Sequence, residues 1–185
     1  CSSDLLAYST VSHMGFILLA FMAGSIGSTA GLYYAITYAL MAAAGFGILM
    51  VLSNDNIECE EIKDLAGLNQ RHAWFALLML LVMFSMAGIP PLMGFYAKFG
   101  VIMVLLKFHY VWLSVFAVVM SLIGAFYYLR VVKVMYFDEP THDQPIGSNY
   151  AAKFFLSVNA FLLVLWGVMP QTMIDWCAKA LENTL

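Results

Sequence analysis

Lys98 is the residue whose type and position point most directly to chemistry, because it is a charged side chain well inside the apolar run 73–106. In a membrane, a lysine at mid-depth costs about 2.5–3.5 kcal/mol on insertion scales, so it normally faces a protein or water interior. Gly88, Pro90 and Pro91 precede it and form a predicted structural break, since proline cannot continue a regular helix. Gly94, one turn before Lys98, is expected to leave room beside it.

A lysine close to a helix break predicts an ion path, because unpaired backbone groups at membrane depth are tolerated only beside protein or a wet cavity. Desolvation disfavours the ammonium and an acidic neighbour favours it, so switching that neighbour would load and release a proton. The alternative is that Lys98 extends its ammonium to the membrane interface.

His13 is the second candidate, near the middle of the apolar run 5–24. Ser9 and Thr10 precede it by four and three residues, so on a helix the three side chains share a polar face. Histidine titrates near neutral pH, which suits a proton relay. A packed, hydrogen-bonded core histidine explains the same pattern equally well.

The composition places these residues in a membrane protein. Of the 185 residues, 63% are hydrophobic and 10% are charged, and the mean hydropathy is +0.87. A soluble domain is about 45–50% apolar and about 25% charged. These values exclude a soluble enzyme, a disordered segment and a nucleic-acid binder, which would carry a basic face. The three widely spaced cysteines and the absence of a nucleotide loop predict no metal or redox centre in this chain.

The chain is predicted to be a single all-α membrane domain, because a bilayer core needs roughly 20 apolar residues per helix. Five spans are expected: 5–24, 30–52, 73–106 with a break at 88–91, 111–129 and 154–173. The fourth run ends in Tyr127-Tyr128-Leu129-Arg130, aromatic and basic residues that are typical of a membrane interface. As one straight helix, the third run would reach about 50 Å, so it is either a hairpin or one broken span.

Loop charges favour the broken span. That topology puts five basic residues on one side of the membrane and two on the other, whereas the hairpin splits them four to three. Cytoplasmic loops carry the excess of Lys and Arg. The loops 53–72 and 138–149 are therefore predicted to be cytoplasmic, with the C-terminus outside. The five basic residues are Lys63, Arg71, Arg130, Lys133 and Lys153.

Five segments, in order along the chain, resemble the antiporter-like membrane subunits of respiratory complex I. Residues 85–99, SMAGIPPLMGFYAKF, are similar to the broken-helix signature of that family, and residues 5–16 to its histidine-bearing helix. The other three segments are 62–68, 127–130 and 167–171, of which the last two point to the subunit N branch.

The resemblance implies that this chain corresponds to a C-terminal fragment of a fourteen-span subunit, and that its five spans are the last five. Ser3-Asp4 stands where the family tends to have a basic pair, which favours an artificial or frameshifted start.

The resemblance further implies a subunit of a proton-pumping NADH:quinone oxidoreductase in the bacterial inner membrane. Lys98 would be the proton-carrying lysine and His13 a relay. NADH, FMN, iron–sulfur clusters and quinone would belong to the rest of the complex and none to this chain. The expected partners are other membrane-arm subunits and the lipid bilayer, with no nucleic acid. A subunit of a multisubunit sodium/proton antiporter and a non-functional truncated remnant are the alternatives.

Overall fold

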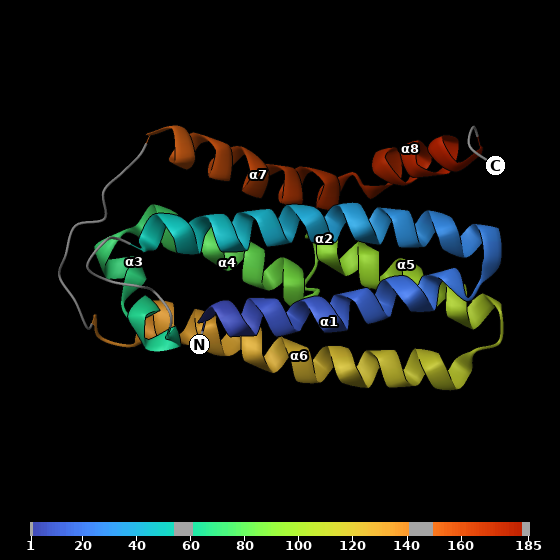
Figure 1. Ribbon diagram of the computed structural model, residues 1–185, viewed down its shortest axis with the longest axis horizontal. Coiled ribbons are helices and arrows are strands. Elements are labelled where there is room, and N and C mark those ends of the chain that lie inside the picture. The colour runs from blue at the N-terminus through green and yellow to red at the C-terminus, as the bar shows by residue number, and fades with distance from the viewer. Residues whose placement is uncertain (1, 54–60, 141–149, 183–185) are drawn as a thin grey trace.

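Apolar segments separated by glycine, proline and polar clusters form the helices of this protein, shown as a computed structural model in Figure 1. The structure describes residues 2–53, 61–140 and 150–182. Within those ranges every regular element is helical, which confirms the all-α class. The elements are α1 (Ser2–Phe21), α2 (Gly24–Leu52), the 3₁₀ helix η1 (Ile62–Leu65), α3 (Leu68–Arg71), α4 (Ala73–Ala87), α5 (Met93–Lys107), α6 (Val111–Phe137), α7 (Tyr150–Val168) and α8 (Pro170–Glu182).

The long helices lie side by side along the bundle, and α4 and α5 lie end to end among them (Figure 1). α4 begins at the end of the bundle that carries α3, and α5 finishes at the opposite end, where α6 begins. The third crossing is therefore one discontinuous helix and not a hairpin. α1, α2, α6 and α7 are each long and apolar enough to cross a membrane. The protein is an integral, multi-pass membrane protein.

Several helices begin or end away from the expected positions. The glycine-rich segment after α1 is the first turn of α2, which begins at Gly24 with a φ of +63°. α6 continues past Arg130 to Phe137, so the expected end at residue 129 falls inside the helix. α7 ends at Val168 and Pro170 starts α8, because proline is suited to a first helical position, where its missing N–H is not needed.

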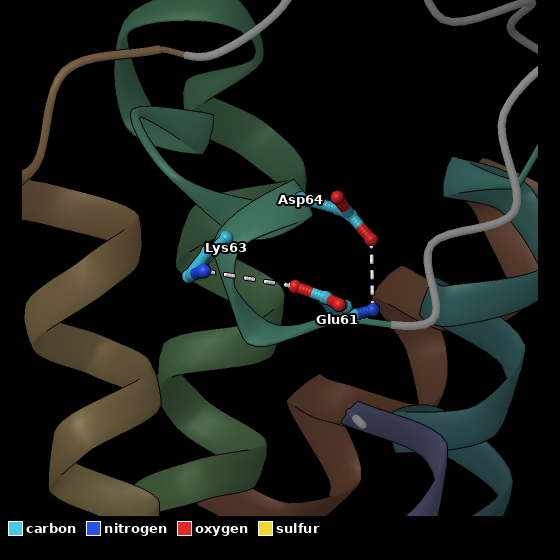
Figure 2. A network of polar contacts seen from close by, with 3 residues as sticks. All are labelled: Glu61, Lys63 and Asp64. Carbon is cyan, nitrogen blue, oxygen red and sulfur yellow. Dashed lines mark hydrogen bonds and ion pairs between the residues drawn. The ribbon is translucent and has the colours of Figure 1, made fainter.

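Between α2 and α4, a short polar network of Glu61, Lys63 and Asp64 lies at the start of η1 (Figure 2). The Glu61 main-chain N–H donates to Asp64 Oδ2 at 2.7 Å, and this bond helps to start η1. Lys63 Nζ lies 4.0 Å from Glu61 Oε2, and both side chains are largely exposed, so this ion pair adds little stability. The Gly67 N–H donates to the Val134 carbonyl at 3.3 Å and ties the connection to α6.

Candidate functional site

The site is built on the end of α4, where the discontinuous helix stops. Gly88 has a φ of +85°, a left-handed conformation that favours glycine and ends the helix. Its N–H donates to the carbonyls of Phe84 and Ser85 at 3.1 and 3.0 Å. The last carbonyls of a helix have no partner within it. The chain then turns through Pro90 and Pro91 before α5 begins, so the carbonyls of this last turn need other donors.

Lys98 supplies those donors. Its side chain is 8% exposed, and its Nζ donates to the carbonyls of Met86 and Ala87 at 2.8 and 3.2 Å. A third bond, of 2.9 Å, goes to Ser121 Oγ on α6. A helix C-terminus carries partial negative charge, so the end of α4 stabilises the ammonium of Lys98. Within the described ranges, the hydrogen-bond acceptors of Lys98 are neutral oxygens and not carboxylates.

The two glycines of the predicted break have different roles. A Cβ at Gly88 would lie 3.1 Å from Lys98 Cδ, so Gly88 is the residue that makes room for the lysine. Gly94 was expected to do this, but it packs on α4 instead. Its N–H donates to Ser85 Oγ at 3.1 Å, and a Cβ there would overlap the Ser85 carbonyl oxygen. Gly94 and Lys98 lie four residues apart on one face of α5, but the α4 backbone at Ser85 occupies the space that Gly94 leaves.

Gly167 on α7 supports the break from the other side. A Cβ at this position would overlap the Pro91 carbonyl oxygen and lie 2.7 Å from Leu92 C and Met93 N. The absence of a side chain therefore lets α7 contact the backbone of the break directly. A glycine inside an apolar helix is the sequence signal that could have indicated this close approach.

His13 is 2% exposed and lies within a group of tyrosines. Its Nδ1 is 2.9 Å from the Tyr34 hydroxyl and its Nε2 is 3.3 Å from the Tyr128 hydroxyl. Its ring stacks on Tyr38, with 4.8 Å between ring centroids. Thr10 Oγ1 is 2.6 Å from the Tyr38 hydroxyl and extends the network along α1. Both imidazole nitrogens thus face groups that can donate or accept a proton.

The tyrosines and Ser121 were not identified from the sequence as site residues. Tyr128 was expected at the membrane interface, but it is 5% exposed and hydrogen-bonds to His13. α6 continues beyond Arg130 to Phe137, so Tyr128 lies inside the helix and not at its end. Tyr34 and Tyr38 come from α2, and their hydroxyls meet α1 only when the two helices pack.

A cavity of about 390 Å³ connects the surroundings of Lys98 with those of His13. It is lined by Lys98, Ser121, His13 and Tyr128, and continues between α1 and α6 as far as Arg130. This volume corresponds to roughly ten water molecules. In residues 2–53, 61–140 and 150–182, no three His, Cys, Asp or Glu side chains form a metal site. The cavity therefore places a buried lysine near a buried histidine whose two ring nitrogens face tyrosine hydroxyls.

Discontinuous helices occur in a class of multi-pass membrane protein that includes secondary transporters. The comparison with known families agrees with this class. Residues 3–124 match the family described as "NADH:quinone oxidoreductase/Mrp antiporter, TM", and the chain belongs to that family.

Curated relatives resemble the chain over nearly its whole length. NADH-quinone oxidoreductase subunit N of Neisseria gonorrhoeae is 81% identical over 98% of this chain and 38% of the relative. The protein of the same name from Nitrosomonas europaea is 50% identical over the same shares. The chain therefore spans about 38% of the length of these relatives.

Solved structures share the fold. A chain of respiratory complex I from Thermus thermophilus with bound aureothin superposes with a TM-score of 0.80 at 27% identity, over 92% of this chain and 38% of that one. A chain of the Mrp complex from Dietzia sp. has a TM-score of 0.81 at 21% identity, over 96% of this chain and 42% of that one. The second likeness shows the fold alone.

Proposed function

We propose that this chain acts as part of a proton-translocating membrane-arm subunit of NADH:quinone oxidoreductase in a bacterial inner membrane. The 81% identity to a subunit N supports this assignment. In this proposal, residues 1–185 form one membrane domain that assembles with other membrane-arm subunits. NADH, FMN, iron–sulfur clusters and quinone act elsewhere in the assembly.

The observation that carries the proposal is the environment of Lys98. Its ammonium is buried on the end of α4 and on Ser121, in a cavity that it shares with His13. Burial disfavours the charged lysine, whereas the carbonyls and the hydroxyl favour it. Because these effects oppose each other, a modest change in charge nearby can decide whether Lys98 holds its proton. Lys98 then takes up and releases a proton, and His13 relays it along the bundle.

Substitution of Lys98 tests the proposal in the complete subunit within its membrane assembly. Lys98→Ala should abolish proton pumping and slow NADH:quinone electron transfer, because the two processes are coupled. Lys98→Arg should also be defective, since arginine keeps its charge but hardly ever deprotonates. Lys107→Ala is the matched control, because Lys107 is an exposed lysine in the last turn of the same helix.

The results separate the possible roles of Lys98. Normal pumping by Lys98→Arg would show that Lys98 acts only as a fixed positive charge. Normal pumping by Lys98→Ala would show that Lys98 has no part in the mechanism. If the subunit instead rescued sodium-dependent growth without NADH oxidation, the result would support a subunit of a multisubunit sodium/proton antiporter. Failure to enter any respiratory assembly would select the non-functional remnant.

A further inference from the structure

The two tyrosines that hold His13 have different surroundings. Tyr34 belongs to α2 and is 1% exposed, whereas Tyr128 belongs to α6 and lines the cavity. The Tyr34 hydroxyl faces Nδ1 of the imidazole, and the Tyr128 hydroxyl faces Nε2. A neutral imidazole has one N–H and one lone pair, so it donates to one tyrosine and accepts from the other. The tyrosine that donates therefore decides the tautomer of His13.

The Tyr34 hydroxyl has a single acceptor for its proton. Among the residues that the structure describes, the hydrogen-bond partner of this hydroxyl is His13 Nδ1, at 2.9 Å. Packing encloses the side chain of Tyr34, whose ring stacks on Phe16 with 5.5 Å between ring centroids. A buried donor that lacks an acceptor is strongly disfavoured. Tyr34 therefore donates to Nδ1, and Nδ1 carries no proton.

The Tyr128 hydroxyl has other acceptors for its proton. Ser9 of α1 is a hydrogen-bonding neighbour of this hydroxyl. Ser9 Oγ donates its own proton to the Leu6 carbonyl at 2.7 Å, so its oxygen can accept a bond from Tyr128. Ser9 and Tyr128 also line the cavity, which is large enough to hold water molecules as further acceptors. Tyr128 can thus accept from an N–H on Nε2 of His13 and still donate its own proton.

The two other protonation states of His13 leave a donor without an acceptor. With the proton on Nδ1, the Tyr34 oxygen would accept from the ring, and the Tyr34 proton would have no acceptor in the described part of the chain. The imidazolium carries an N–H on both nitrogens and would leave the Tyr34 proton in the same position. Among the described residues, the neutral tautomer with its proton on Nε2 is the state that satisfies all three side chains.

We propose that Tyr34 is a positioning residue that fixes His13 as the neutral tautomer with its proton on Nε2. The N–H of His13 then points to Tyr128 and the cavity, and the Tyr34 hydroxyl covers the lone pair of Nδ1. His13 releases the proton on Nε2 toward Tyr128, and it takes up a further proton at Nδ1 when the Tyr34 hydroxyl gives way. The role of this arrangement in pumping rests on the relay function proposed for His13.

Solid-state NMR of isotopically labelled histidine nitrogens tests the tautomer in the complete subunit within its membrane assembly. A difference spectrum against His13→Gln isolates the two ring signals of His13. The wild type should show a protonated Nε2 and an unprotonated Nδ1 with the chemical shift of a hydrogen-bonded acceptor. In Tyr34→Phe, the Nδ1 signal should shift to the value of an acceptor without a hydrogen bond, because the phenyl ring has no hydroxyl to donate.

Tyr38→Phe is the matched control, because Tyr38 also belongs to α2 and stacks on the His13 ring, but its hydroxyl bonds to Thr10. It should leave both nitrogen signals of His13 unchanged. Tyr128→Phe should shift the Nε2 signal and leave Nδ1 as an acceptor from Tyr34, so the test does not depend on the folding of one variant.

Three outcomes would overturn the proposal. They are a protonated Nδ1 in the wild type, an imidazolium in the wild type, and an equal shift of Nδ1 in Tyr34→Phe and Tyr38→Phe. The spectra do not depend on pumping, so a failure of the tautomer assignment is distinguishable from a failure of the function proposed for Lys98. Normal pumping by the Lys98 variants would contradict that function and leave the nitrogen signals of His13 as the test of this proposal.

Discussion

Lys98 and Ser121 belong to different helices, and their side chains meet inside the bundle, with 2.9 Å between Lys98 Nζ and Ser121 Oγ. Among the residues that the structure describes, the other two acceptors of Lys98 are main-chain carbonyls of α4. Ser121 is therefore the side chain through which α6 contacts the lysine. A movement of α6 relative to the break would change the support of the ammonium, and this makes Ser121 a direct test of the site.

Ser121→Ala should reduce coupled proton pumping several-fold. A hydrogen bond to a charged group contributes about 1.5–3 kcal/mol, and its removal weakens the hold on the protonated lysine. Pumping and NADH:quinone activity in membrane vesicles measure the effect. Ser114→Ala is the control on the same helix, because Ser114 Oγ donates to the Tyr110 carbonyl and should leave pumping unchanged. Equal pumping by the two variants would exclude a role for the Ser121 hydroxyl.

Gly167→Ala should destabilise the protein by about 1–3 kcal/mol, because the new methyl group overlaps backbone atoms of the break that cannot rotate away. Thermal unfolding of the assembled subunit in detergent measures the change. Gly100→Ala is the matched control, since a Cβ at Gly100 meets nothing within 4 Å. It should be neutral or stabilising by about 0.5–1 kcal/mol. A Gly167→Ala variant as stable as the control would show that α7 does not brace the break.

His13→Gln should assemble normally but pump more slowly, because glutamine keeps hydrogen bonding to the tyrosines and does not titrate. His13→Leu should lose both the hydrogen bonds and the relay, leaving the buried hydroxyls of Tyr34 and Tyr128 without this partner. Assembly on native gels and pumping in vesicles separate the two effects. The relay is contradicted if His13→Gln pumps like the wild type while His13→Leu merely fails to assemble.

Cysteines at Lys63 and Lys179 should react from opposite sides of the membrane. Lys63 lies before α4 and Lys179 on α8, at opposite ends of the bundle (Figure 1). An impermeant thiol reagent should label Lys63→Cys only from the cytoplasmic side, as the basic loops predict. It should label Lys179→Cys only from outside. Labelling of both positions from the same side would be incompatible with a single discontinuous crossing.

The sequence by itself determined the class of fold and the location of the break. Apolar runs of membrane length, with few charges between them, can be stable only as helices that satisfy their own backbone hydrogen bonds. The prolines at positions 90 and 91 remove two backbone donors, so the third run cannot be a continuous helix wherever it lies. Lys98 stands out for a similar reason, because a charge inside an apolar run is costly in any arrangement.

The partners of these residues were decided only by the tertiary structure. Lys98 and Ser121 are far apart in the sequence, and so are His13 and Tyr128. No helical periodicity connects the members of either pair. Their contacts exist because α1, α5 and α6 pack together. The role of Gly94 was wrongly predicted for the same reason. The pattern along α5 predicted free space beside Lys98, but in the structure Ser85 of α4 packs into the space next to Gly94. A helical pattern specifies which faces are apolar, whereas side-chain contacts between helices depend on how those faces dock.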